Sequence, residues 1–462
     1  MTLLATRVQQ QFRLRGAATG PELRAALNIS QPTLSRELSR MKGIVRLGAA
    51  RSTRYAMARE VPGMGSEFPL YWLDTEGRAS RVGILHTLEM GQWYLAQDDP
   101  WEALRGSEFS QGLYPGLPWF LDDLRPQGFL GRNFARAFGP RLGFPPEPRD
   151  WTADQIVTAL VRYGEEMPGA FVIGEAMLAR VQAMAINSPD PVDELARESV
   201  YPELATMALT GERPGSSAAG EQPKFLIRVR RRSGLVEEVI VKFSGPRERA
   251  EESRWADLLV AESISAQVLS EHNIPAAATN LVEGGRRMFL ESVRFDRAGE
   301  HGRRGVVSLW AVDGGFFGQP DTPWTAAANR LESDGWLRPE EAMRLTMLWW
   351  YGSLIANTDM HYGNVSLFLG RNLPLRLAPI YDMLPMLYRP GLQGSLPPRD
   401  FAPPPPPPEA MEPWQEAAEM AEETWSRFAD TRLISEEFRE IARANRQTVA
   451  RYRRRFGSSA NA

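Results

Sequence analysis

The stretch ANTDMHYGN at residues 356–364, followed by YDMLP at residues 381–385, decides how the rest of the chain is interpreted. It places an aspartate at Asp359, an asparagine five positions later at Asn364, and a second aspartate at Asp382. Phosphoryl transfer from a nucleotide needs one carboxylate to orient the attacking hydroxyl, and an amide oxygen with another carboxylate to hold Mg²⁺ against the phosphates. Two protein ligands suffice, because magnesium keeps several waters and also binds phosphate oxygens. The spacing therefore favours nucleotide-dependent phosphoryl transfer.

The segments around this stretch fit the same interpretation. Residues 347–355 are apolar and predict a buried helix that ends in a polar loop. Residues 365–369 and 375–380 predict two strands that carry Asn364 and Asp382 at their ends. The alternative is a turn whose Asn and Asp side chains only satisfy backbone groups. The features upstream favour the first interpretation.

The composition is that of an ordinary globular chain. Of the 462 residues, 43% are hydrophobic and 24% are charged. Cysteine is absent, which excludes disulfides, thiolate metal sites and a cysteine nucleophile. The start of the chain has no long apolar segment, and no run of 18 apolar residues occurs. We therefore expect a cytoplasmic protein without a membrane partner.

The net charge of −3 is distributed unevenly along the chain. Residues 1–59 carry a net charge of +9, so the remainder carries −12. A basic arm on an acidic body suggests a module that binds a polyanion.

Residues 1–60 predict a winged helix-turn-helix domain. A helix starts near Thr19, a turn follows at residues 28–30, and Ser30 caps a second helix that begins at Gln31. Residues 44–48 and 53–57 form a hairpin, the wing. We expect DNA contacts from the exposed face of the second helix and from the wing. The predicted DNA-binding residues are Gln31, Thr33, Ser35, Arg36, Arg40, Arg51 and Arg54. The alternative is a module of the same shape that contacts only proteins.

Lysine is rare, which draws attention to each occurrence. Of 54 basic residues only Lys42, Lys224 and Lys242 are lysines. A compact ammonium suits a point contact to phosphate better than a planar guanidinium does. Lys224 ends a small-residue loop at residues 211–224, and Lys242 ends an apolar strand at residues 239–243. Such a loop lets backbone N–H groups approach phosphates, although a flexible hairpin turn is an equally good interpretation of the loop alone.

A helix at residues 254–269 follows Lys242. Its Glu262 is a candidate ion-pair partner of Lys242, as in protein kinases, where a strand lysine pairs with a helix glutamate. Glu251 and Glu252 compete for that role, and a solvated face is an alternative for each of the three. Residues 287–297 then predict a strand that leads into a connection, the position of an adenine-binding hinge.

Together these segments resemble the HipA family of bacterial serine/threonine kinases, the toxins of two-gene toxin–antitoxin modules. The resemblance spans residues 65–450 and is carried by residues 217–224, 291–297, 357–364 and 381–382. It is greatest to the YjjJ/HipH-like subgroup, in which a helix-turn-helix is fused at the N-terminus. The implied fold is α+β: a winged helix-turn-helix at residues 1–60, then a two-lobed, protein-kinase-like domain with an N-terminal lobe at 65–285 and a C-terminal helical catalytic lobe at 290–456.

The resemblance also implies roles for individual residues. Asp359 is the catalytic aspartate, Asn364 and Asp382 are the magnesium ligands, and Ser217 is the autophosphorylated serine. The implied ATP-binding residues are Ala219, Gly220, Glu221, Gln222, Lys224, Lys242, Leu290, Glu291, Val293, His361, Asn364, Tyr381 and Asp382. His361 is expected to form hydrogen bonds rather than transfer protons. The implied cofactors are ATP and Mg²⁺, and the implied substrate is a translation-linked protein such as an aminoacyl-tRNA synthetase. A homodimer is left open.

Two departures from the family concern substrate choice and autoregulation. Residues 306–310 stand where the family has an acidic stretch after the hinge, and Pro223 lies within the phosphate loop. Two rival functions follow: a transcriptional regulator whose kinase-like domain senses nucleotide without catalysis, and a small-molecule kinase, because such kinases use the same Asp–Asn–Asp arrangement. Phosphoryl transfer that is unchanged in Asp359→Asn would favour the nucleotide-sensing regulator over a kinase. Substrate trials distinguish the small-molecule kinase from the protein kinase.

Overall fold

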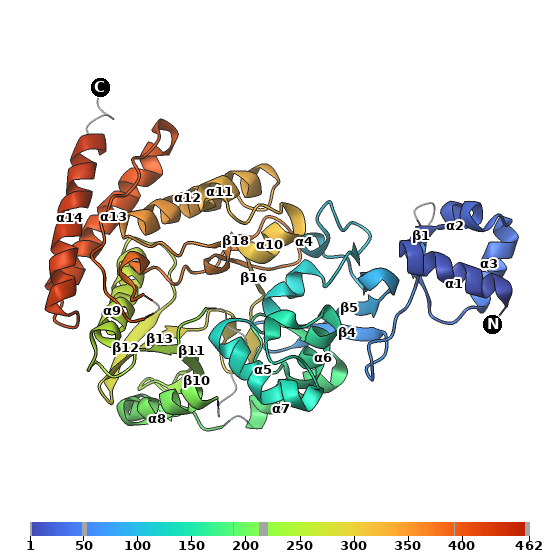
Figure 1. The fold of residues 1–462 in the computed structure, drawn as a ribbon, viewed down its shortest axis with the longest axis horizontal. Coiled ribbons are helices and arrows are strands. Elements are labelled where there is room, and N and C mark those ends of the chain that lie inside the picture. Colours follow the sequence, from blue (N-terminus) through green and yellow to red (C-terminus); the bar gives the residue numbers. More distant parts are fainter. Residues whose placement is uncertain (1, 49–52, 188, 212–219, 392, 458–462) are drawn as a thin grey trace.

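The computed structural model describes residues 2–48, 53–187, 189–211, 220–391 and 393–457 (Figure 1). Its N-terminal module is a small unit of three helices and a three-stranded sheet with strand order β1-β3-β2. Its elements are α1 (Leu3–Arg15), β1 (Ala18–Thr19), α2 (Gly20–Leu27), α3 (Gln31–Arg40), β2 (Ile44–Leu47) and β3 (Arg54–Met57). Thr19 forms a capping box with Glu22, and Ser30 accepts a hydrogen bond from the backbone N–H of Thr33, so both predicted helix starts are confirmed. The apolar residues of the three helices form one small core.

The middle of the chain forms an antiparallel sheet with strand order β7-β6-β5-β4-β8. The strands are β4 (Glu67–Leu73), β5 (Ala79–Thr87), β6 (Trp93–Gln97), β7 (Leu113–Tyr114) and β8 (Phe171–Ile173), and the main helices are α5 (Gly128–Leu142), α6 (Ala153–Tyr163) and α7 (Glu175–Asn187). These strands and helices make up a β-rich middle region. Sequence patterns missed β8, because its three residues are all buried and show no alternation.

A second five-stranded sheet, with order β12-β13-β11-β10-β9, carries the two rare lysines. Its strands are β9 (Val192–Asp193), β10 (Lys224–Arg230), β11 (Val236–Phe243), β12 (Thr279–Gly284) and β13 (Arg287–Val293). The accompanying helices are α8 (Arg197–Thr210) and α9 (Ala250–Glu271). One face is covered by α8 through an aromatic cluster around Tyr201, Phe225 and Phe289. Lys224 and Lys242 lie directly opposite each other in the β10–β11 ladder.

Helices make up most of the C-terminal part (Figure 1). They are α10 (Leu309–Phe316), α11 (Trp324–Ser333), α12 (Pro339–Leu354), α13 (Met411–Asp430) and α14 (Glu436–Gly457). The short strands between them are β14 (Arg297–Ala298), β15 (Gly302–Arg303), β16 (Val306–Ser308), β17 (Ser366–Phe368) and β18 (Arg376–Leu377). The buried α12 packs on α13, where the hydroxyls of Tyr351 and Thr424 lie 2.9 Å apart.

The predicted boundary between residues 285 and 290 is wrong. It falls in the tight turn of the β12–β13 hairpin, whose strands pair over six residue positions. A break there would split a sheet, and a hairpin cannot be shared between two independently packed units. Among the described residues, no helix is both long and apolar enough to cross a membrane.

Candidate functional site

The loop after α12 is fixed by a chain of hydrogen bonds from asparagine side chains. Asn357 donates from Nδ2 to the backbone oxygen of Asp382 at 3.1 Å, and its Oδ1 accepts from the backbone N–H of Asp359 at 3.0 Å. Asn364 donates from Nδ2 to the backbone oxygen of Asp359 at 2.7 Å. Asn357 and Asn364 are both buried. Asp359 and Asp382 are thereby held to one another across 23 residues of sequence.

Asp382 meets Lys242 at the centre of the site. The Lys242 ammonium donates to Asp382 Oδ1 and to both carboxylate oxygens of Glu262, at 2.6 and 2.8 Å. Lys242 and Glu262 are buried, so the ion pair on which the sequence left alternatives open is present. Glu262 is supplied by α9 and Lys242 by β11, while Asp382 follows β18.

Electrostatics within this cluster keep Lys242 protonated and Asp382 ionised. Burial works to lower the pKa of Lys242, but the carboxylates of Asp382 and Glu262 outweigh it and raise that pKa. Burial likewise opposes ionisation of Asp382, while Lys242 and Lys224 hold its pKa below the usual range. Asp382 also has a φ of +56°, a left-handed backbone conformation that costs roughly 1–3 kcal/mol for residues other than glycine. The local strain is consistent with a position determined by function.

Lys224 lies beside this cluster and is buried. Burial and the neighbouring Lys242 lower its pKa to about 8, although the Asp382 carboxylate acts in the opposite direction. Its ammonium faces Gly220: a Cβ built on Gly220, which has a φ of +102°, would lie 2.7 Å from Lys224 Nζ. A side chain at position 220 would therefore collide with the ammonium.

The end of the loop that the sequence predicts to bind phosphate is anchored on α5 of the middle region. Phe129 N–H donates to the backbone oxygen of Gly220 at 2.9 Å, and Arg132 pairs with Glu221 at 2.6 Å. The Arg132 guanidinium lowers the pKa of Glu221. The pattern of the sequence gave no signal for this contact between residues 90 positions apart. Gln222 Nε2 is buried and has no hydrogen-bond partner among the described residues. Ser217 and Ala219 lie outside the described residues.

His361 and Tyr381 each form a hydrogen bond with the backbone of Gly363. His361 is exposed, and its Nδ1 accepts a hydrogen bond from the Gly363 N–H at 3.0 Å. The Tyr381 hydroxyl donates to the Gly363 oxygen at 2.8 Å and lies 2.8 Å from Ser366 Oγ. The ring of Tyr381 stacks on Phe295 with ring centroids 5.7 Å apart.

Two of the hinge residues are not placed as expected. Leu290 and Glu291 lie within β13, which pairs with β11 on one side and β12 on the other, so they do not form an open edge for adenine. The Glu291 carboxylate is fully buried and is bound by Arg197, Arg231 and Tyr201. Val293 is half-buried at the end of the strand, and its N–H donates to the Ala278 oxygen at 2.8 Å. The apolar run at residues 288–290 was a sign of a buried central strand.

The predicted nucleic-acid residues of the N-terminal module lie mostly on one exposed helix face. Gln31, Ser35, Arg36 and Arg40 are exposed on α3, and Thr33 is half-exposed. Arg54 instead donates to the Ala17 backbone oxygen at 2.7 Å, so part of its guanidinium is used within the module. Arg51 lies outside the described residues.

Comparison with known proteins identifies both large regions of the chain. Residues 64–182 match the family model of the YjjJ-like toxin middle domain, and residues 216–453 match that of the HipA-like C-terminal domain. These ranges put a division between the two families at residues 182–216.

The chain is also similar to individual proteins in sequence or in fold. The chain is 37% identical to Toxin YjjJ of Escherichia coli (strain K12) over 430 residues, which is 93% of this chain and 94% of that protein. Among solved structures, a chain of the Shewanella oneidensis MR-1 complex of HipA, HipB and operator DNA is similar in fold, with a TM-score of 0.52 and 14% identity over 84% of this chain and 97% of that one. The Helicobacter pylori proinflammatory kinase CtkA aligns with a TM-score of 0.38 and 12% identity over 53% of this chain and 94% of its own. The chain therefore belongs to the family of YjjJ-like toxins that carry a HipA-like C-terminal domain.

Proposed function

We propose that this protein is an ATP-dependent serine/threonine protein kinase. The observation that carries the proposal is the single cluster formed by Lys242, Glu262 and Asp382, with Asp359 and Asn364 fixed to it by buried amides. A lysine held by a helix glutamate next to a metal-binding aspartate is the arrangement that protein kinases use to position nucleotide phosphates.

The residues present fit ATP and Mg²⁺. Lys242 and Lys224 provide two ammonium groups for phosphate oxygens, and Gln222 Nε2 is a buried donor without a partner among the described residues. Asn364 uses Nδ2 internally, which leaves Oδ1 as the atom to bind the metal together with the Asp382 carboxylate. In the described part of the chain no group of three or more His, Asp or Glu side chains could hold a metal. The ion would therefore depend on phosphate oxygens for its remaining ligands. When bound, Mg²⁺ neutralises charge that develops on the transferred phosphoryl group.

In this mechanism Asp359 orients the hydroxyl of the acceptor. It is half-buried, and no described residue is hydrogen-bonded to its carboxylate, so the carboxylate is available to accept a proton or a hydrogen bond. Asn357 and Asn364 keep its backbone fixed. Asp382, whose Oδ1 accepts from Lys242, would hold the metal through its carboxylate, and Glu262 would keep the Lys242 ammonium beside the phosphates.

The loop that includes Ala219 and Gly220 is proposed to contact the phosphates, and Ser217 is proposed as an autophosphorylation site. A phosphate there would add about two negative charges next to a nucleotide. Repulsion should then displace the loop and lower activity. The protein substrate is proposed to be a component of translation, such as an aminoacyl-tRNA synthetase.

The N-terminal module is proposed to be a winged helix-turn-helix that binds operator DNA. Its support is the exposed row of α3 and the net charge of +9 on residues 1–59. The similar structure from Shewanella oneidensis is described as a complex with HipB and operator DNA. In the present chain the DNA-binding module would be covalently attached to the kinase.

The deciding experiment is incubation of the purified protein with labelled ATP and Mg²⁺, alone and with a cell lysate, followed by mapping of phosphorylated residues. We expect label on Ser217 and on at least one lysate protein, and none with Asp359→Asn. Label of equal intensity in Asp359→Asn would contradict the assignment of the catalytic aspartate. Binding of ATP without any label transfer would favour a nucleotide-sensing regulator.

A further inference from the structure

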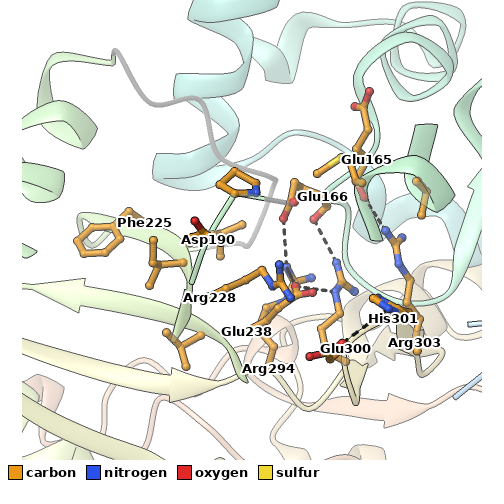
Figure 2. A pocket seen from close by; sticks show the side chains of 18 of the residues that line it. Glu165, Glu166, Asp190, Phe225, Arg228, Glu238, Arg294, Glu300, His301 and Arg303 are labelled. Atoms are coloured by element: carbon orange, nitrogen blue, oxygen red, sulfur yellow. Dashed lines mark hydrogen bonds and ion pairs between the residues drawn. The ribbon is translucent and has the colours of Figure 1, made fainter. Parts of the chain in front are cut away.

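A second charged cavity lies where the middle region meets the β10–β11 sheet. Its volume is about 270 Å³, and it is lined by the turn after α6, by α7, and by strands β10, β11, β14 and β15 (Figure 2). Glu238 on its wall precedes Lys242 by four residues on β11, a separation of about 13 Å. The cavity lining does not include the residues of the Lys242 cluster. It is therefore a neighbour of the nucleotide site with its own set of charges.

Arginines hold this junction together. Arg297 donates to the Met167 backbone oxygen at 2.9 Å. Arg303 donates to the Glu165 backbone oxygen at 2.6 Å (Figure 2). Asp296 accepts from the Gly169 N–H at 2.9 Å and from the Arg294 guanidinium at 2.8 Å. The turn at residues 165–169 is thus held by side chains of the HipA-like domain. A ligand in the cavity would contact both domains.

Most carboxylates around the cavity already have partners. Glu238 pairs with Arg297 at 3.0 Å and lies 3.6 Å from Arg294. Glu165 pairs with Arg180 at 2.8 Å. The Glu238 pairs involve Arg294 and Arg297, and the Glu165 pair involves Arg180, so neither carboxylate forms an ion pair with Arg303 or Arg228.

Arg303 is the cation left without a counter-ion. It is 7% exposed, and no carboxylate lies within 4.0 Å of it among the described residues. One of its terminal nitrogens, Nη1, is buried and has no hydrogen-bond partner there, and the same holds for Nη1 of Arg294. Burial and repulsion from Arg297 and Arg294 lower the pKa of Arg303 to about 9, although the carboxylates of Glu166 and Glu238 act in the opposite direction from beyond ion-pair distance. Leaving a buried charge unpaired is costly, which is why such groups normally find a partner.

Arg228 adds a second available cation on the wall. It is half-buried on β10 and lines the cavity, and its side chain has no hydrogen bond or ion pair within the described part of the chain. Figure 2 shows it on the strand beside Glu238 and Arg294. A guanidinium presents its N–H groups in a planar fork that matches the two oxygens of a carboxylate or phosphate.

We infer that the cavity binds the oxyanion group, phosphate or carboxylate, of a small solute through Arg303 and Arg228. The bound anion supplies the missing counter-charge to Arg303 and accepts from the buried Nη1 atoms. Because the site uses none of the proposed catalytic residues, this inference holds or fails independently of the proposed kinase activity. A solute bound here would join the middle domain to the sheet that carries Lys242.

The test is titration of the full-length protein with inorganic phosphate in a calorimeter, at constant ionic strength, and separately with succinate. Four variants are compared: Arg303→Gln, Arg228→Gln, Arg304→Gln and Lys224→Gln. Arg304 is an exposed neighbour whose side chain has no hydrogen bond or ion pair with described residues, so it is the matched control. Lys224→Gln reports any phosphate that binds in the nucleotide cleft instead. Arg228→Gln removes no hydrogen bond or ion pair among the described residues, so it keeps the test valid even if Arg303→Gln folds poorly.

We expect the dissociation constant for phosphate or succinate to rise about tenfold in Arg303→Gln and in Arg228→Gln, since each loses a charge-assisted hydrogen bond. Arg304→Gln and Lys224→Gln should bind as the wild type does. Preference for phosphate or for succinate assigns the solute to one class. Binding that is lost only in Lys224→Gln, binding that is equal in all variants, or no binding of either anion to the wild type would each overturn the inference.

Discussion

Replacing Lys242 by methionine should destabilise the sheet and helix that hold the nucleotide site. Lys242 has 9% of its side chain exposed, and the Glu262 side chain that it pairs with has 4% exposed. Methionine fills a similar volume but leaves the Glu262 carboxylate buried without a cation. The Asp382 side chain, at 26% exposure, has partial access to water. The main penalty therefore comes from Glu262.

Breaking a buried ion pair by removing one partner costs about 3–5 kcal/mol, whereas replacing both partners by neutral groups is often close to neutral. We expect Lys242→Met to lie in that range. The double variant Lys242→Met with Glu262→Gln should recover more than half of the loss, because no buried charge then remains unpaired at position 262. It should not recover ATP binding, since the proposed phosphate contact of Lys242 is still missing.

Hydrogen exchange of the α9 backbone amides measures this quantity locally, without assuming that the whole chain unfolds in one step. Lys42→Met, at an exposed position of the N-terminal module, is the control for the chemical change itself. A loss below 1 kcal/mol in Lys242→Met, or a double variant as unstable as the single one, would refute the view that the pair is electrostatically coupled and buried.

Four further outcomes are expected. Asp359→Asn should abolish label transfer while ATP affinity, measured by calorimetry, changes less than about threefold, because we propose that this residue orients the acceptor and does not bind the nucleotide. Substitution of Arg36 and Arg40 by alanine should weaken operator binding and reduce its salt dependence, with ATP affinity unchanged; an unaltered footprint would contradict the DNA-binding face. Burial raises the pKa of Asp123 from 3.8 to about 6, so its contribution to stability is complete below pH 4 and is lost as the pH rises toward 6. In Asp123→Asn the free energy of unfolding should therefore depend less on pH between pH 4 and 6. An unchanged pH dependence in that window would contradict this assignment. Arg132→Gln should speed hydrogen exchange at residues 220–224 without unfolding α5, whereas unchanged exchange there would show that the ion pair does not hold the loop.

The site was largely predictable because its chemistry is local in sequence. Asp359, Asn364 and Asp382 lie within 24 residues, and an apolar helix and short strands flank them. Lys242 stood out because lysine is so rare in this chain. A glutamate on the following helix was expected to pair with Lys242, but the sequence could not choose between Glu251, Glu252 and Glu262. Burial decided the choice, and burial depends on packing that no local pattern encodes.

The errors come from long-range packing. Leu290 and Glu291 lie in an inner strand and not at an open edge, which the sequence could not establish because it does not give the strand order, although the apolar run at residues 288–290 is typical of a buried strand. The domain boundary failed for the same reason. The role of Asn357, which fixes the backbone of Asp382 and Asp359, was missed although the residue lies inside the diagnostic stretch. A small amide before the first aspartate was the available signal.

The seating of Gly220 against α5 has an evolutionary consequence. A Cβ on Gly128 would lie 2.6 Å from the Gly220 oxygen, and Arg132 pairs with Glu221, so two regions recognised as separate families share one seam at the nucleotide loop. In a chimera that joins the first region of one relative to the second region of another, the residues on the two sides of this contact need not be complementary. Lineages can therefore exchange these regions only if both sides of the seam change in concert.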